Sequence, residues 1–305
     1  MGKLACVFPG QGSQSVGMLA DLAADHSIVL DTFSEASDAL GYDLWDLCQH
    51  DPENTLNQTH ITQPALLTAS LAAWKVFTDV KQLKPDYLAG HSLGEYTALV
   101  AAQVLTLKDA VKLVEARGQF MQAAVPEGTG AMYAIIGLED AKIEQICKAI
   151  AAETKLVVAP VNYNSPGQIV IAGNKEAVDL AGKSCKEAGA KRALPLAVSV
   201  PSHCALMREA ADQLADLLGP MQFAEPIYAV INNVDVSIEH SGVAIKRALI
   251  KQLYSPVRWT ESIEKLCGQG VDRIIEVGPG KVLSGLNKRI NKSLVLENFN
   301  SPSDY

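Results

Sequence analysis

The sequence predicts an α/β protein with a mostly parallel sheet and a smaller lobe inserted into it. Short apolar runs alternate with helical segments, and the order of elements changes between about residues 128 and 198. A chain of 305 residues suits two lobes, or one core with an insertion. With 48% hydrophobic and 20% charged residues the chain can bury a large core, which excludes disorder as its main state.

The larger lobe is expected to contain both ends of the chain. Its helix over 106–125 has a Thr-x-x-acid start at Thr106 and Asp109, and Pro126 and Gly128 follow its end. Further helices are expected from about residue 16, over 95–104 and after residue 280. Strands are predicted at 4–8, 87–89, 228–231 and 273–277, each a short apolar run.

The middle of the chain follows the order β-α-β-β-α-β, which is that of the ferredoxin-like unit. Strands are predicted at 132–136, 156–163, 168–172 and 192–200, and helices at 139–152 and 175–188. The segment Asn164-Ser165-Pro166-Gly167 is a typical turn. We therefore expect residues 128–198 to form an inserted small subdomain, and residues 1–127 and 199–305 to form the large α/β core.

Charge and cysteine content exclude several classes of protein. A net charge of −8 with only 6% aromatic residues argues against nucleic-acid binding and against attachment to anionic lipid. The apolar run 4–8 is too short for a signal peptide, and no stretch approaches a membrane span. Six scattered cysteines without a CxxC pair, and no metal-ligand spacing, favour a reduced, cytoplasmic protein without a metal site.

The segment Gly90-His91-Ser92-Leu93-Gly94 has the Gly-x-Ser-x-Gly pattern between a predicted strand and a predicted helix. Its glycines lack the Cβ atoms that would clash in a sharp turn, so the turn exposes the Ser92 hydroxyl. The helix N-terminus that follows favours developing negative charge. This context favours a serine nucleophile, while a Gly-Ser turn without chemistry is the alternative.

A serine nucleophile needs a base, and His203 is the best placed of the six histidines. It follows Pro201-Ser202 and is expected to open a helix over 203–218, on the inward face of that helix. Burial and a helix N-terminus favour the neutral imidazole, which can accept a proton. A lone core histidine is the alternative, but a serine that precedes its histidine in the chain is the order found in α/β hydrolases.

Arg117 falls within the apolar stripe of the helix predicted over 106–125. It follows Val114 by three residues and precedes Met121 by four. A guanidinium that points into a core stays charged and requires a partner anion. A buried carboxylate, or a side chain that reaches the rim, is the structural explanation. A pocket for an acyl group with its own carboxylate is the functional explanation.

The segment Gly10-Gln11-Gly12 resembles the start of a dinucleotide-binding fingerprint, but Ser15 stands where the last glycine is needed. No acidic residue follows at the expected distance, so nicotinamide and flavin cofactors are not expected. A turn at the end of a strand can still present the Gln11 N–H to a ligand as a donor of an oxyanion hole. A plain tight turn is the alternative.

Five segments of the chain, taken in order, carry a resemblance to a known family. They are Phe8-Pro9-Gly10-Gln11-Gly12-Ser13, Gly90-His91-Ser92-Leu93-Gly94-Glu95-Tyr96, Arg117, Val200-Pro201-Ser202-His203 and Glu276-Val277-Gly278-Pro279-Gly280. They resemble the malonyl-CoA:acyl-carrier-protein transacylases of bacterial type II fatty-acid synthesis, over about residues 4–290. The resemblance implies a hydrolase-like core with an inserted ferredoxin-like lobe.

The resemblance also implies roles for individual residues. Ser92 would be the nucleophile and His203 its base. Arg117 would hold the malonyl carboxylate, and the N–H groups of Gln11 and Leu93 would form the oxyanion hole. A second set would support them: Gln252 would orient the histidine through its main-chain carbonyl, and Gln63 and Asn162 would line the pocket.

The implied reaction transfers the malonyl group from malonyl-CoA, through an ester on Ser92, to the phosphopantetheine thiol of acyl carrier protein. Coenzyme A enters as part of the substrate, and no permanently bound cofactor is expected. Carrier proteins of this pathway are acidic, whereas the chain has a net charge of −8, so docking requires a local basic patch. We expect that patch to consist of Lys191, Arg192, Lys281, Lys288 and Arg289.

Two other functions are compatible with parts of the sequence. A serine esterase or thioesterase would share the serine turn and the histidine, but Arg117 and the absence of an evident triad aspartate argue against it. A catalytically silent, carrier-binding subunit is disfavoured because both Ser92 and His203 are present.

Overall fold

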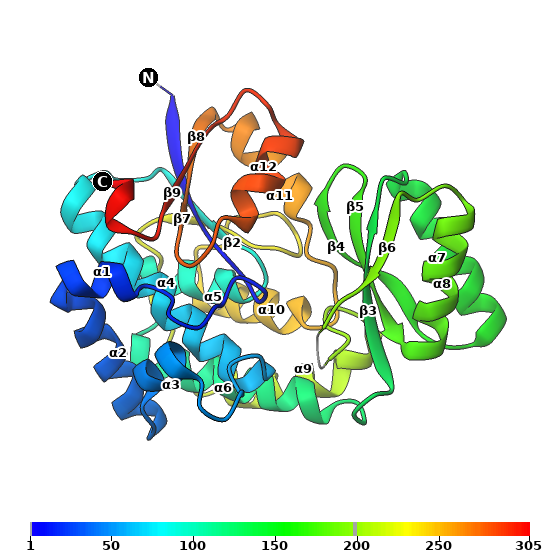
Figure 1. Cartoon of the computed structure of the whole chain (residues 1–305), viewed down its shortest axis with the longest axis horizontal. Helices are drawn as coiled ribbons and strands as arrows, with labels where there is room; N and C mark the ends of the chain where they lie inside the picture. Colours follow the sequence, from blue (N-terminus) through cyan, green and yellow to red (C-terminus); the bar gives the residue numbers. More distant parts are fainter. Residues whose placement is uncertain (1, 198–199) are drawn as a thin grey trace.

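The computed structural model of the chain describes residues 2–197 and 200–305 and has two lobes, each built on its own sheet (Figure 1). The sheet of the larger lobe has five strands in the order β7-β2-β1-β8-β9, and all four pairings are parallel. The strands are β1 (Lys3–Phe8), β2 (Tyr87–Gly90), β7 (Ala229–Ile231), β8 (Val271–Val277) and β9 (Val295–Phe299). The predicted α/β class with a parallel sheet is therefore confirmed.

Helices cover both faces of this sheet. They are α1 (Ala20–Asp25), α2 (Ser27–Leu40), α3 (Leu44–His50), α4 (Thr59–Lys81), α5 (Leu93–Ala101), α6 (Leu107–Ala123), α9 (Arg208–Leu218), α10 (Gly242–Gln252), α11 (Trp259–Gly268) and α12 (Val282–Ile290). Cys6 and Phe8 of β1 point into the core formed with α2, α4 and α6, whereas Ala5 and Val7 pack against α11 and α12. A strand buried on both faces explains why β1 reads as a continuous apolar run.

The smaller lobe contains a four-stranded antiparallel sheet in the order β4-β5-β3-β6. Its elements are β3 (Gly130–Ile136), α7 (Asp140–Thr154), β4 (Val158–Ser165), β5 (Gln168–Asn174), α8 (Lys175–Glu187) and β6 (Arg192–Pro195). Both helices lie on the face of the sheet turned away from the larger lobe (Figure 1). The small sheet therefore presents its other face to the parallel sheet.

Backbone hydrogen bonds connect the lobes behind the site. The N–H of Val257 donates to the carbonyl of Val161 at 2.8 Å, and the N–H of Tyr163 donates to the carbonyl of Val257 at 2.9 Å. Val257 lies in the segment between α10 and α11, so this segment extends the small sheet beside β4. The contact fixes the position of β4 relative to the larger lobe.

Two predicted elements differ from the observed ones near the junction of the lobes. The strand expected over 192–200 ends at Pro195. One residue later the N–H of Leu196 still donates to the carbonyl of Met132 in β3, at 2.9 Å. The helix expected over 203–218 begins later, with a 3₁₀ turn over Ala205–Met207 followed by α9. The expected boundary between residues 198 and 199 lies outside the described residues.

Candidate active site

Ser92 lies in the turn between the end of β2 and the start of α5, with φ 50° and ψ −107°. Two glycines make this turn possible. A Cβ on Gly90 would lie 1.9 Å from the carbonyl carbon of Gly94, and a Cβ on Gly94 would lie 2.2 Å from the carbonyl oxygen of Phe8. The sharp turn predicted from the Gly-x-Ser-x-Gly pattern is therefore present, and only glycine fits at its two ends.

The Oγ atom of Ser92 lies 2.7 Å from Nε2 of His203. On the other side of the ring, Nδ1 lies 2.7 Å from the main-chain carbonyl oxygen of Gln252. A carbonyl oxygen can only accept, so Nδ1 carries the proton and Nε2 is left to accept the hydroxyl proton of Ser92. The arrangement sets the tautomer that a base requires.

His203 reaches this position from a turn and not from a helix. Its φ is +63°, and α9 begins five residues later at Arg208. The expectation that His203 opens a helix over 203–218 is therefore wrong. The two hydrogen bonds of the ring, to Ser92 and Gln252, accompany this left-handed backbone conformation, which a helical start would not allow.

The imidazole of His203 is neutral at physiological pH. Its side chain is buried, and burial lowers the pKa of His203 to about 3, with the positive charge of Arg117 acting in the same direction. The hydrogen bond to the Gln252 carbonyl acts in the opposite direction and is outweighed. A proton acceptor is thus available next to the Ser92 hydroxyl over the whole physiological range.

Arg117 is buried in α6, with 1% of its surface exposed. Its Nη1 atom donates to Oε1 of Gln63 at 2.7 Å, and its Nη2 atom donates to Oε1 of Gln252 at 3.0 Å and to Oγ of Ser92 at 3.5 Å. The Nε atom has no hydrogen-bond partner among the described residues, and the guanidinium carbon lies 5.3 Å from the centre of the Tyr96 ring.

Neutral groups therefore make all the hydrogen bonds of this guanidinium. None of the ion pairs within residues 2–197 and 200–305 includes Arg117. Glu95 is buried nearby, but its carboxylate accepts from the backbone N–H of Asn233 and from Nε2 of Gln252. An anion that entered the site would find a buried positive charge with free hydrogen-bonding capacity.

A cavity of about 310 Å³ lies between the lobes, with Ser92 on its wall. Four other residues singled out from the sequence also line it, namely Gln11, Arg117, Asn162 and His203. The Oδ1 atom of Asn162 is buried and has no hydrogen-bond partner among the described residues. The structure thus brings together residues from five separate segments of the chain.

Three further predicted residues lie behind the cavity wall. Gln63 is fully buried and contacts Arg117, so it supports the cavity wall without lining it. Gln252 is likewise fully buried. Leu93 is the first residue of α5, and no hydrogen bond recorded for the described residues uses its N–H or that of Gln11.

Comparison with known proteins agrees with this geometry. A model of the acyl transferase domain matches residues 5–296. The chain is 61% identical to the malonyl CoA-acyl carrier protein transacylase of Escherichia coli K12 over 303 residues, which cover 99% of this chain and 97% of that protein. It is 63% identical to the protein of the same name from Haemophilus influenzae over 291 residues, or 95% and 93% of the two chains.

The chain belongs to the malonyl CoA-acyl carrier protein transacylase family. Among solved structures, it matches an acyl carrier protein S-malonyltransferase from Vibrio cholerae with a TM-score of 0.96 and 62% identity, over 99% and 98% of the chains. It also matches a malonyl-transacylase solved with a type II PKS acyl-carrier protein, with a TM-score of 0.97 and 58% identity, over 99% and 97% of the chains. The resemblance inferred from five short segments is confirmed.

Sequence reasoning missed a histidine in this member of the family. His91 is the neighbour of Ser92 and also lines the cavity, with Nε2 2.8 Å from Oδ1 of Asn164. Its ring lies tilted against Trp259, with 5.6 Å between ring centres, and burial lowers the pKa of His91. Its place in the Gly-x-Ser-x-Gly segment was a signal, but the side chains of His91 and Ser92 were expected to diverge. The structure shows instead that both line the cavity.

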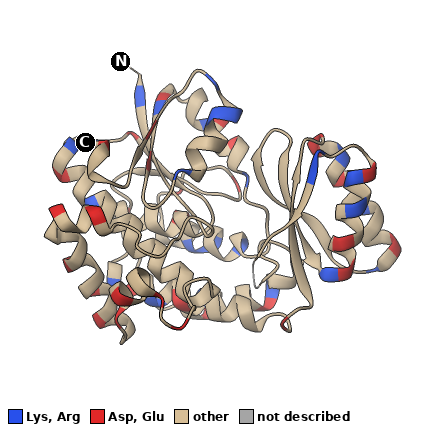
Figure 2. Ribbon diagram, viewed as in Figure 1, with Lys and Arg blue, Asp and Glu red and all other residues tan. Residues whose placement is uncertain are grey.

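The five basic residues expected to meet a carrier protein of this family are all exposed. Figure 2 shows Lys and Arg on α12, which packs against β4 of the small sheet. The side chain of Arg289 donates to Oε1 of Gln168, the first residue of β5. In the small sheet, Ile136 of β3 pairs with Gln168 on one side and with Arg192 of β6 on the other. Arg289 and Arg192 therefore lie at the same end of the small sheet.

Within residues 2–197 and 200–305, no helix combines the length and the apolar character needed to cross a bilayer. Three or more His, Cys, Asp or Glu side chains that could together hold a metal ion were not found there either.

Proposed function

We propose that the protein transfers the malonyl group of malonyl-CoA to the phosphopantetheine thiol of acyl carrier protein, through an ester on Ser92. One observation carries the proposal: a buried Arg117 guanidinium without a counter-ion lies 3.5 Å from the nucleophile candidate in a shared cavity. The relatives named above are malonyl transacylases, and one was solved with an acyl-carrier protein. The reaction supplies fatty-acid biosynthesis.

In the first half-reaction, the Ser92 hydroxyl attacks the thioester carbonyl while Nε2 of His203 takes its proton. A C–O bond forms, the C–S bond breaks, and the coenzyme A sulfur leaves as a thiolate, which can take the proton from His203. A thiol with a pKa of about 8.5 leaves far more readily than an amine. The carbonyl of Gln252 therefore suffices to orient His203, where proteases use a carboxylate.

The negative charge on the tetrahedral intermediate requires donors. The N–H groups of Leu93 and Gln11 are available, since no recorded bond among the described residues uses them. Leu93 follows Ser92 at the N-terminus of α5, where the aligned peptide dipoles favour an anion. We assign the oxyanion hole to these two N–H groups.

Arg117 binds the malonyl carboxylate and so selects the acyl group. Gln63 and Gln252 hold the guanidinium through its Nη atoms, and charge-assisted bonds from an arginine to a carboxylate are stronger than those bonds to neutral amides. Asn162 contributes a free Oδ1 acceptor on the cavity wall, suited to an amide N–H of the pantetheine arm.

In the second half-reaction, the phosphopantetheine thiol of the carrier attacks the ester on Ser92. His203 takes the thiol proton and returns it to Oγ as the C–O bond breaks. The carrier docks on the basic residues Lys191, Arg192, Lys281, Lys288 and Arg289. Coenzyme A leaves before the carrier enters, so the kinetics are ping-pong, and the reaction uses no permanently bound cofactor and takes place in the cytoplasm.

The arrangement of the lobes suits this chemistry. Residues 128–198 form an inserted ferredoxin-like subdomain, a proposal supported by the strand order β4-β5-β3-β6 with two helices on one face. Residues 1–127 and 199–305 form a hydrolase-like core, supported by a parallel sheet whose strand β2 ends in the serine turn.

Intact-mass analysis tests the proposal. Malonyl-CoA should add one malonyl group to the protein, and a holo carrier added next should remove it and gain the same mass. Ser92→Ala should abolish the first adduct. Release of free malonate in place of transfer would show a hydrolase, and the absence of any adduct on the folded protein would exclude the covalent route.

A further inference from the structure

Glu95 is a buried carboxylate directly behind the nucleophile turn, with 2% of its surface exposed. Its Oε2 atom accepts two hydrogen bonds, each of 2.9 Å: one from the backbone N–H of Asn233 and one from Nε2 of Gln252. No ion pair within the described part of the chain includes Glu95. A buried carboxylate is costly unless it is paired, so its presence here calls for a reason.

The two residues that Glu95 binds hold both peptide groups of Ser92. The Oδ1 atom of Asn233 accepts the Ser92 N–H at 2.7 Å, and its Nδ2 atom donates to the carbonyl of Gly90 at 2.7 Å. The Nε2 atom of Gln252 donates to the carbonyl of Ser92 at 3.1 Å. The nucleophile is therefore held from both sides by side-chain amides.

Ser92 needs such support because its backbone is strained. A non-glycine residue at φ 50° and ψ −107° lies outside the favoured regions and persists only when its surroundings hold it there. Gln252 also contacts the other two parts of the site, with Oε1 3.0 Å from Nη2 of Arg117 and its main-chain oxygen 2.7 Å from Nδ1 of His203. A shift of Gln252 would therefore displace Ser92, Arg117 and His203 together.

We propose that Glu95 is a positioning residue: through one carboxylate oxygen it fixes Asn233 and Gln252, and these two residues hold the strained turn of Ser92. The inference rests on the proposed nucleophilic role of Ser92. What matters is the reach of the side chain, since the acceptor must lie where both N–H donors converge. A shorter side chain should leave both donors unsatisfied and release the turn.

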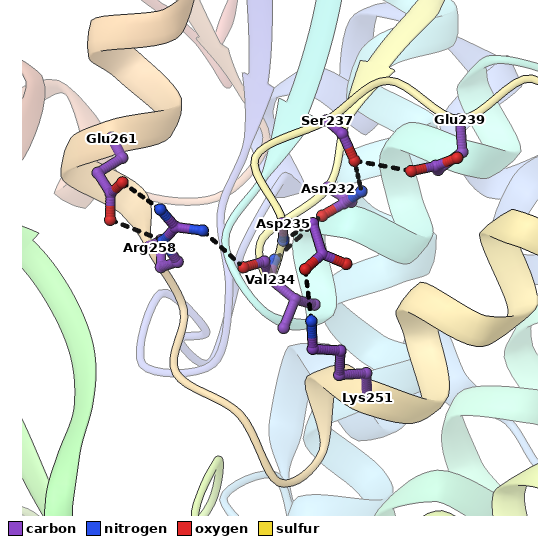
Figure 3. Close-up of polar contacts among 8 residues, drawn as sticks. All are labelled: Asn232, Val234, Asp235, Ser237, Glu239, Lys251, Arg258 and Glu261. Atoms are coloured by element: carbon purple, nitrogen blue, oxygen red, sulfur yellow. Dashed lines mark hydrogen bonds and ion pairs between the residues drawn. The ribbon is translucent and has the colours of Figure 1, made fainter.

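The loop that carries Asn233 has anchors of its own (Figure 3). The Oδ1 atom of Asn232 accepts the N–H groups of Val234 and Asp235, at 3.1 and 2.8 Å. Lys251 of α10 contacts Asp235, and Arg258 donates to the carbonyl of Val234 at 3.1 Å. Because none of these contacts involves Glu95, the loop should stay in place when Glu95 is replaced, and only the fine position of its amide should change.

Two substitutions distinguish the effect of the length of the Glu95 side chain from the effect of its charge. Glu95→Gln keeps the reach and an acceptor oxygen but removes the charge, whereas Glu95→Asp keeps the charge and withdraws it by one methylene group. The readout is the labelling rate of Ser92 by a fluorophosphonate, which needs neither a thioester nor a carboxylate. In that step an Oγ–P bond forms, the P–F bond breaks, fluoride leaves, and His203 takes the hydroxyl proton.

We expect Glu95→Gln to label within about threefold of the wild-type rate, and Glu95→Asp to label about 10- to 100-fold more slowly, as displacements of about 1 Å at a reacting group do. Should Glu95→Asp fail to fold, Glu95→Ala takes its place: it removes the acceptor altogether and should label at least as slowly. An aspartate or alanine variant that folds and labels at the wild-type rate would overturn the proposal, as would a glutamine variant as slow as the aspartate variant.

Glu276 provides a matched control. It is also fully buried, and its carboxylate accepts the N–H groups of Leu283 and Ser284 at the start of α12, at 3.0 and 2.7 Å. Glu276→Gln and Glu276→Asp should change the melting temperature but leave the labelling rate of the folded protein unchanged.

If the wild type is labelled by the fluorophosphonate but not by malonyl-CoA, the proposed function fails while the comparison of Glu95 variants remains valid.

Discussion

The Nη2 atom of Arg117 and the Oγ atom of Ser92 lie 3.5 Å apart on the wall of one cavity. The guanidinium makes its hydrogen bonds to neutral groups, and Nε has none among the described residues. A buried positive charge without a counter-ion attracts an anion, and here the anion would arrive next to a nucleophile. With the roles proposed for Arg117 and Ser92, the acyl group would be selected and activated by two groups only 3.5 Å apart.

Replacement of Arg117 should therefore affect acyl groups unequally. Arg117→Ala is expected to lower kcat/KM for malonyl-CoA by roughly 30- to 150-fold more than for acetyl-CoA, because a desolvated, charge-assisted contact contributes about 2–3 kcal/mol. Acylation rates of both thioesters on the same variant measure this ratio. Arg117→Lys keeps the positive charge but lacks the planar guanidinium, so its preference for malonyl-CoA over acetyl-CoA should lie between those of the wild type and Arg117→Ala. Equal losses for both substrates would assign Arg117 a structural role only.

The pH dependence of acylation should lack an acid limb near the ordinary pKa of histidine. Since burial lowers the pKa of His203 to about 3, the free enzyme keeps a neutral base far below neutrality. We expect kcat/KM for malonyl-CoA to stay constant within about twofold from pH 8 to pH 5, measured by rapid quench and intact mass. A tenfold fall between pH 7 and pH 5.5 would contradict a buried base.

The same histidine should make the fold sensitive to acid. Between pH 6.5 and pH 3 the unfolded chain binds a proton at His203 and the folded chain does not, so stability falls as the pH falls through this window. His203→Gln removes this proton, and the wild type should lose about 2 kcal/mol relative to the variant between pH 6.5 and pH 4.5. Denaturant unfolding of both proteins at each pH measures the difference.

Glu95 changes the stability with pH in the opposite direction, but it is present in both the wild type and His203→Gln. Burial raises the pKa of Glu95 to about 7, so its contribution to stability improves as the pH falls from 7 towards 4.5. Only the difference between wild type and His203→Gln therefore isolates the histidine. A difference that stays constant with pH would mean that His203 titrates normally in the folded protein.

Reversal of charge on α12 should impair the carrier and not coenzyme A. The double variant Lys288→Glu/Arg289→Glu is expected to raise the KM for acyl carrier protein at least about tenfold, while acylation by malonyl-CoA stays unchanged. The control is Lys142→Glu/Lys148→Glu on α7, two exposed lysines on the outer face of the small lobe. An unchanged KM for the carrier would remove α12 from the docking surface.

The local parts of the site could be predicted from the sequence. A Gly-x-Ser-x-Gly segment determines its own turn, and Arg117 was visible because a cation interrupts an apolar stripe. The N-cap at Thr106 was also predicted, since it depends on residues three apart, and its side chain accepts the Asp109 N–H at 3.1 Å.

Contacts between distant segments could not be predicted in the same way. Asn233 and Glu95 are 138 positions apart in the chain and are joined by a hydrogen bond, but neither lies in a sequence pattern that predicts its contact partner. The conformation of His203 was missed because a positive φ at a non-glycine residue depends on its tertiary contacts. The strand β9 was missed too, since Glu297 and Asn298 interrupt its short apolar run, as an edge position tolerates.

The backbone pairing between β4 and Val257 has a bearing on how acyl donors reach Ser92. Two main-chain hydrogen bonds join the lobes only five residues beyond Gln252, whose carbonyl oxygen lies 2.7 Å from Nδ1 of His203. A hinge motion that separated the lobes would therefore pull on this contact. We therefore expect the folded arrangement of the lobes to set the width of the entrance. Turnover should then depend on how well the pantetheine arm of each acyl donor or acceptor fits the cavity, and not on the rate of an opening motion.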